Sequence, residues 1–196
     1  MRNILLTISY DGTDFCGWQR QDDVLGGQAE RTVQSEVETA LEKIHKQKIQ
    51  LYGSGRTDSG VHALGQAANF YTPIDTIPAE NYLRAINGFL PKDVRITDSK
   101  EVPQDFSARK SATSRVYRYF ISFGRSVSAN NLRYSWFVKN YEPNVERLNR
   151  YCRCLRGELD CSSFAAKGDD SVSTFRYIDD AAFFIQKDIW GNDILV

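Results

Sequence analysis

A glycine-rich stretch, Gly53–Ala63, contains the residues best suited to chemistry. Within it, Arg56 supplies a guanidinium and Asp58 a carboxylate, two positions apart. Glycine lets a backbone turn sharply and come close to a ligand. A carboxylate kept ionised by a neighbouring cation can act as a nucleophile or as a base. The same residues also fit a simple turn in which the aspartate caps its own backbone, so the stretch alone leaves both interpretations open.

A second candidate region is distinguished by its charge. Residues 106–141 contain no acidic side chain, although the whole chain has a net charge of zero. Cations are interleaved with aromatic rings here, among them Arg109, Arg115, Tyr117 and Arg118. Because cations neutralise phosphates and rings stack on bases, this composition suits a nucleic-acid surface. An ordinary solvated face is the alternative interpretation.

A third candidate is the segment 13–31, which is rich in Gly, Gln and Asp and predicts a long loop. It carries Phe15, Trp18 and Arg20. An exposed tryptophan beside an arginine suits contacts with bases and phosphates. The alternative is that the aromatic side chains pack into the core.

The hydrophobic pattern predicts the elements that must position these residues. Strands are predicted at 4–10, 48–52, 66–71, 93–102, 114–123, 175–186 and 193–196, the first of them buried on both faces. Helices are predicted to begin near Thr32, Pro78 and Asn144. The first six elements have the order βαββαβ, which indicates an α+β fold with a ferredoxin-like, helix-backed antiparallel sheet.

Length and composition narrow the class of protein. A chain of 196 residues with 41% hydrophobic residues is globular and forms one large or two small domains. The change in composition suggests domains at 1–105 and 106–196. No apolar run of about 18 residues and no signal peptide is present, so we expect a cytoplasmic protein without a membrane segment. The spacing of the four cysteines and the presence of only two histidines argue against a metal site.

The end of the sequence suggests truncation. The predicted strand 193–196 stops on three apolar residues. A native terminus seldom cuts a core strand, because a hydrophobic face and a ladder would be left unfilled. We therefore expect that the chain is truncated at its C-terminus.

Taken together, the motifs resemble the TruA family of tRNA pseudouridine synthases. The match runs in order along the whole chain, and its Gly-Arg-Thr-Asp-x-Gly-Val-His motif is specific, which favours chemistry over a simple turn. Ser59 and Cys16 depart from the commoner Ala and His of the family. The matching stretches are residues 10–21, 32–34, 55–63, 106–109, 115–119, 157–160 and 163–164.

The resemblance implies the pseudouridine-synthase fold, two ferredoxin-like halves with a joined, mostly antiparallel sheet around a central cleft, the second half being incomplete here. It implies isomerisation of uridine in the anticodon stem-loop (positions 38–40) of tRNA by a homodimer that needs no cofactor or metal. Asp58 would be the catalytic nucleophile or base, Tyr117 would stack on the base and shuttle a proton, and Arg56 would flip the base or hold a phosphate. RNA-binding roles are expected for Trp18, Arg20, Arg109, Arg115 and Arg118.

Two other interpretations stay open. Family members continue beyond this point with a segment whose arginine pairs with the catalytic carboxylate. A chain without it could be a tRNA-binding fragment with impaired catalysis. A glycoside hydrolase fits less well, because that reaction uses two carboxylates flanking the bond and the loop supplies one.

Overall fold

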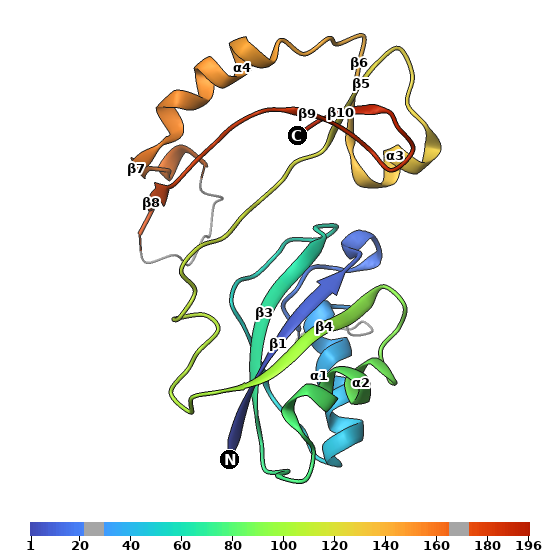
Figure 1. Cartoon of the computed structure of the whole chain (residues 1–196), viewed down its shortest axis with the longest axis vertical. Coiled ribbons are helices and arrows are strands. Elements are labelled where there is room, and N and C mark those ends of the chain that lie inside the picture. The colour runs from blue at the N-terminus through green and yellow to red at the C-terminus, as the bar shows by residue number, and fades with distance from the viewer. Residues whose placement is uncertain (22–29, 165–172) are drawn as a thin grey trace. The chain divides into compact units, whose positions relative to one another are not determined.

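The computed structural model describes residues 1–21, 30–164 and 173–196. This part of the chain divides into two units, Met1–Arg115 and Val116–Val196 (Figure 1). The change in composition suggested a boundary after residue 105, ten residues earlier. Each unit has its own sheet and helices, and each is described separately below.

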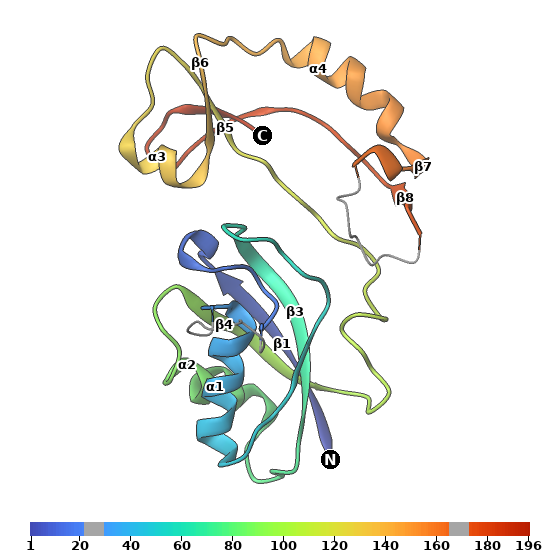
Figure 2. The same cartoon turned by 180° about the vertical axis from the view of Figure 1, so that it is seen from behind.

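The first unit has the predicted element order βαββαβ. Its strands are all antiparallel to their neighbours and lie in the order β2-β3-β1-β4, the order of a ferredoxin-like sheet. Both helices cover one face of the sheet, behind it in Figure 1 and in front of it in Figure 2. The elements are β1 (Arg2–Tyr10), α1 (Val33–His45), β2 (Leu51–Gly53), β3 (Ala63–Thr72), α2 (Tyr82–Asn87) and β4 (Val94–Val102), with short 3-10 turns at Gly12–Asp14 and Ala79–Asn81.

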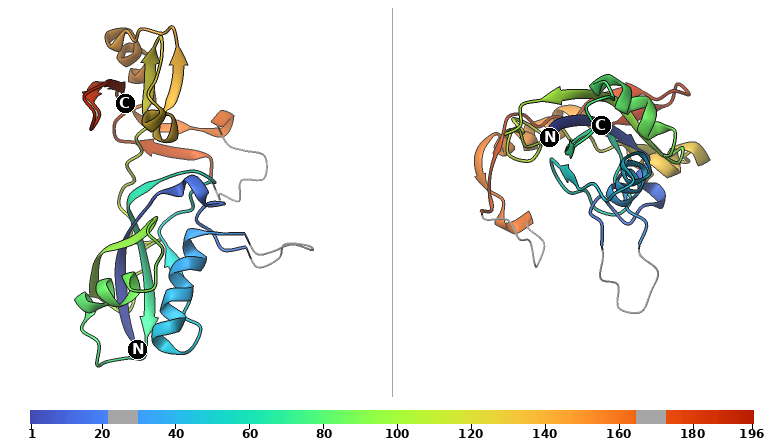
Figure 3. Two further views of the ribbon diagram at one scale, coloured as in Figure 1. Left: turned by 90° about the vertical axis from the view of Figure 1, so that its right-hand side faces the viewer. Right: turned by 90° about the horizontal axis from the view of Figure 1, so that it is seen from below.

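The core of the first unit lies between this sheet and α1, which runs along the sheet in the side view of Figure 3. Strand β1 alternates, with Ile4, Leu6 and Ile8 fully buried and the residues between them half-buried. The strand was expected to be buried on both faces, but only one face is fully buried, because the helices cover only one side. Helix α1 begins where the Thr32 side chain accepts a hydrogen bond from the Ser35 N–H, as its N-cap prediction required.

A buried asparagine pair extends the first unit beyond β4. The Asn69 side chain donates to Asn3 Oδ1 at 2.9 Å and accepts from the Ala108 N–H at 2.9 Å. Asn3 in turn donates to the Phe106 carbonyl at 2.9 Å. These bonds satisfy buried amides and hold the segment that follows β4 against the sheet. Residues up to Arg115 consequently belong to the first unit.

The second unit differs more from expectation. The predicted strand 114–123 is regular only from Ile121, and the predicted strand 175–186 is two short strands. The sheet order is β6-β5-β10-β9, with β5 and β6 parallel, and β7 pairs with β8. The elements are β5 (Ile121–Gly124), α3 (Ala129–Tyr134), β6 (Trp136–Lys139), α4 (Val145–Cys152), β7 (Gly157–Asp160), β8 (Phe175–Ile178), β9 (Ile185–Lys187) and β10 (Asp193–Leu195).

Candidate active site

The glycine-rich stretch forms the connection from β2 to β3 (residues 54–62), which we call the catalytic loop because it carries Asp58, the candidate catalytic residue. Asp58 and Arg56 are exposed on it, and Thr57 between them is half-buried. No hydrogen bond or ion pair within the described ranges engages the Asp58 carboxylate or the Arg56 guanidinium. The two side chains therefore do not form the ion pair that their spacing suggested, and both are open to a ligand.

Thr57 fixes the centre of the catalytic loop to the core. Its hydroxyl shares a hydrogen bond of 2.8 Å with the hydroxyl of Tyr10, which is only 4% exposed. Its carbonyl accepts from the Trp18 N–H at 3.0 Å. The residue immediately before Asp58 is thus held through its side chain by the last residue of β1 and through its carbonyl by the segment that follows β1.

Trp18 does not have the surface position that an RNA-stacking role requires. Its side chain is 2% exposed and belongs to the hydrophobic core of the first unit. The indole packs on Gly53, where an added Cβ would lie 2.6 Å from Trp18 Nε1. Burial of this large ring stabilises the start of the catalytic loop, and the expectation that Trp18 stacks on bases is corrected accordingly.

Two further glycines let the catalytic loop and the segment after β1 touch. A Cβ on Gly12 would lie 1.9 Å from the Val61 carbonyl oxygen, and a Cβ on Gly17 would lie 2.7 Å from the Thr57 carbonyl oxygen. Gly17 also has a φ of +100°, in the left-handed region that side chains disfavour. The Phe15 carbonyl joins the same two segments. It accepts hydrogen bonds from the Gly60 N–H at 3.3 Å and from the Ser59 hydroxyl at 3.1 Å.

His62 ends the catalytic loop and orders it. Its Nδ1 accepts from the Gly12 N–H at 3.2 Å and lies 3.1 Å from Asp11 Oδ1. These contacts join the loop to the turn that follows β1.

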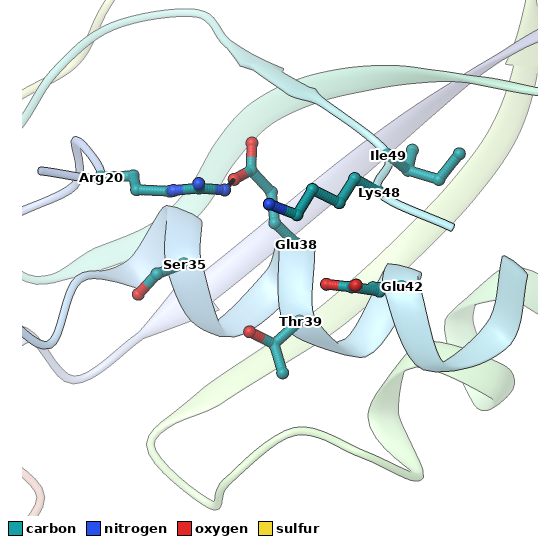
Figure 4. Close-up of a pocket in the computed structure, with 7 residues that line it drawn as sticks. All are labelled: Arg20, Ser35, Glu38, Thr39, Glu42, Lys48 and Ile49. Carbon is teal, nitrogen blue, oxygen red and sulfur yellow. Dashed lines mark hydrogen bonds and ion pairs between the residues drawn. The ribbon is translucent and has the colours of Figure 1, made fainter. Parts of the chain in front are cut away.

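Arg20 lies over α1 at the edge of a shallow depression (Figure 4). Its Nη1 donates to Glu38 Oε2 at 2.9 Å, and the dashed line in the figure marks this pair. Glu38 is 7% exposed, and its other oxygen accepts from Gln34 and from the Leu51 N–H, both at 3.0 Å. Sequence reasoning missed this buried carboxylate, which joins Arg20 to the start of β2. The available signal was Gln34, which lies in the matching stretch 32–34 and donates to this carboxylate.

The ends of the expected loop 13–31 lie side by side. The Cys16 N–H donates to the Arg31 carbonyl at 2.9 Å, and the Arg31 guanidinium sits 4.0 Å above the Phe15 ring. The same guanidinium makes two hydrogen bonds to Asp93, at 2.8 and 2.9 Å. They hold the pKa of Asp93 below its ordinary value. Residues 22–29 of this loop lie outside the described residues.

The region in which cations are interleaved with aromatic rings, residues 106–141, contributes to both units. Arg109 is exposed in the first unit. Arg115 ends that unit and donates from Nη2 to the Ser54 carbonyl at 3.0 Å. Tyr117, which is 69% exposed, and Arg118 lie in the second unit, in a segment without regular structure. The structure thus brings Arg115 to the catalytic loop, which the sequence did not predict.

The first unit is thus an α+β domain that presents an unengaged carboxylate on a loop held against its own core, a placement compatible with nucleophilic or acid–base chemistry. The model of the tRNA pseudouridine synthase family matches residues 6–109. The chain belongs to this family, and its mixed α+β structure agrees with the fold of that family.

Curated relatives extend the match beyond residue 109. A protein of Treponema denticola named tRNA pseudouridine synthase A is 52% identical over 187 residues, which are 95% of this chain and 69% of the relative. A Treponema pallidum protein of the same name is 51% identical over 93% of this chain and 65% of its own length. One from Brachyspira hyodysenteriae is 42% identical over 100% of this chain and 78% of its own length. The chain thus spans about two thirds of the length of the treponemal relatives.

Within the described residues, the longest and most apolar helices fall short of what a membrane crossing requires.

Proposed function

We propose that this chain isomerises uridine to pseudouridine in tRNA. The observation that carries the proposal is the exposed Asp58 carboxylate on the catalytic loop, within the family match. Tyr10 and Trp18 hold Thr57 on one side of it, and the Phe15 carbonyl accepts from the Gly60 N–H on the other. A rigidly held reactive group lowers the cost of reaching the productive geometry.

The reaction rearranges bonds without net gain or loss of atoms. The bond between uracil N1 and ribose C1′ breaks, the base turns, and C5 bonds to C1′. The C5 proton leaves to water and N1 takes up a proton. The Asp58 carboxylate either attacks C1′ or removes the C2′ proton, and both routes return it unchanged.

The other proposed catalytic residues act on the base. The target uridine must leave its stack, at a cost of a few kcal/mol. In this proposal Arg56 fills the gap in the stem or holds the adjacent phosphate, and its exposed guanidinium supports either role. Tyr117 stacks on the turned base and carries the proton released at C5.

RNA binding is assigned to Arg20, Arg109, Arg115 and Arg118. Arg109, Arg115 and Arg118 are exposed, while Arg20 is half-buried and paired with Glu38. Modification at positions 38–40 of the anticodon stem-loop stays a prediction from the resemblance. A homodimer and a cytoplasmic location also stay predictions. Primer-extension mapping of treated tRNA tests the positions, and light scattering of the purified chain tests the dimer.

Tritium release from tRNA labelled at uridine C5 tests the reaction. The parent chain and Asp58→Asn are compared, with Asp98→Asn as the matched control, because Asp98 is also an exposed aspartate of the first unit. We expect release by the parent and by Asp98→Asn, and loss of release in Asp58→Asn. Equal release by all three would remove Asp58 from the mechanism. Binding of tRNA by the parent without release would make the chain a binding protein instead.

A further inference from the structure

Arg115 contacts the turn from which the catalytic loop starts. Its Nη2 donates to the Ser54 carbonyl at 3.0 Å. Its Nε lies 3.4 Å from the position that a Cβ on Gly55 would take, which is an ordinary van der Waals distance. A residue assigned to RNA from its charge alone thus makes a specific contact with the protein backbone.

Strand β3 holds the same turn from the other side. The Ser54 N–H donates to the Ala67 carbonyl at 2.8 Å, and the Gln66 side-chain amide donates to the Gly55 carbonyl. These bonds lie within the hairpin formed by β2 and β3. Among the described residues, Arg115 is the partner that fixes the Ser54 carbonyl from outside this hairpin.

The reactive side chains depend on this backbone. Arg56 and Asp58 follow Ser54 by two and four residues, and both are exposed, with no side-chain hydrogen bond or ion pair to another described residue. Their positions are therefore set by the loop backbone rather than by side-chain packing. A displacement of about 1 Å in a reacting group can cost a factor of about 10² in rate.

We infer that Arg115 is a positioning residue for the reaction. Through the Ser54 carbonyl it holds the catalytic loop in the conformation that presents Asp58 to the ribose. The inference deepens the proposed function and rests on it. A guanidinium has five N–H donors and Ser54 takes one, so Arg115 can also meet a phosphate, and the two roles must be separated by experiment.

Amide hydrogen exchange of the chain without RNA tests the positioning contact directly. The protected N–H groups of Ser54, Gly60 and Val61 are the probes. Arg115→Met removes the donors and the charge but keeps an apolar stem, and Arg84→Met is the control, because Arg84 is exposed on α2 of the same unit. We expect exchange at the probes to rise about fivefold to tenfold in Arg115→Met and to stay unchanged in the control.

Kinetics and salt dependence separate positioning from phosphate binding. At saturating tRNA, Arg115→Met should lower the single-turnover rate roughly tenfold or more, with Arg115→Lys recovering part of it because lysine keeps a donor. A phosphate contact made by Arg115 would separately lower the slope of log affinity against log salt by about one, without changing loop exchange. Unchanged loop exchange, together with a slope reduced by about one, would overturn the inference and make Arg115 a phosphate contact alone. If the parent releases no tritium, the proposed function fails. Amide exchange of the loop would then still show whether Arg115 holds the Ser54 carbonyl.

Discussion

The close contact at Gly12 allows a sharp test of how the catalytic loop is held. Replacing Gly12 with alanine adds one methyl group, whose carbon would lie 1.9 Å from the Val61 carbonyl oxygen and 2.6 Å from the Val61 carbonyl carbon. Real Cβ atoms essentially never come within 3.0 Å of such atoms. The Val61 carbonyl would therefore have to retreat by roughly 1 Å, and the obstacle is backbone, which cannot rotate away as a side chain can.

The retreat would act on Asp58 through hydrogen bonds. The Val61 N–H donates to the Asp58 carbonyl at 3.2 Å, and the neighbouring Gly60 N–H donates to the Phe15 carbonyl at 3.3 Å. Overpacking of this kind costs about 1–3 kcal/mol of stability. Because a shift of about 1 Å in a reacting group can cost a factor of about 10², we expect Gly12→Ala to lower the single-turnover rate about a hundredfold.

The assay compares single-turnover tritium release and thermal unfolding for the parent, Gly12→Ala and Gly65→Ala. Gly65 is the matched control, since it follows the catalytic loop and an added Cβ would lie an ordinary 3.5 Å from the Thr7 methyl group. We expect the control to react at close to the parent rate. Affinity for tRNA should change little in Gly12→Ala, because no RNA-binding cation is altered. A Gly12→Ala rate within about threefold of the parent would refute the reasoning that this contact sets the position of Asp58.

Three further outcomes follow from the contacts of single side chains. Glu38→Gln should cost about 1–3 kcal/mol of stability, measured by urea unfolding, because the new amide would face the Arg20 guanidinium. The control Glu42→Gln, on the exposed side of α1, should cost far less. Arg31 lowers the pKa of Asp93, so this ion pair should stabilise the fold by roughly 1 kcal/mol at pH values above the unfolded-state pKa. The stabilisation should be lost as the pH falls through the lower folded-state pKa. Asp93→Asn should flatten that part of the stability–pH curve, and an unchanged curve would contradict this. Arg118→Ala should reduce the salt slope of tRNA binding by about one, and an unaltered slope would remove it from the RNA contact.

The first unit was predictable because its longest elements carry clear sequence patterns. Strand β1 contains the apolar run Ile4–Leu6, and α1 places Val33, Val37 and Leu41 on one buried face. The Thr32 N-cap agrees with the start of the α1 pattern, and sequence and structure give the same order of elements. The position of Asp58 on the loop between β2 and β3 follows directly from that order.

The second unit was not predictable to the same extent, because its strands are only three or four residues long. Alternation in 114–123 shows which side chains could share a face, but a strand also needs a partner with free backbone groups. Ile121 has such partners in β6 and β10, and the Phe120 carbonyl accepts from the Trp136 N–H, whereas residues 116–119 have none among the described strands. The segment with Tyr117 and Arg118 is irregular for that reason.

The glycines of the matching stretch 10–21 and of the stretch Gly53–Ala63 show that a sequence does not reveal why a glycine is needed. Their number in the catalytic loop suggested close approach to a ligand, and Gly60, with a φ of +78° and open space around it, fits a turn that needs glycine. Gly12, Gly17 and Gly53 serve a different purpose, since each makes room for another part of the same chain. Gly53 in particular admits the Trp18 ring, and this contact decides that Trp18 is a core residue rather than a surface for bases. A missing side chain leaves no hydrophobic pattern of its own, so such contacts become visible only when both segments are placed in space.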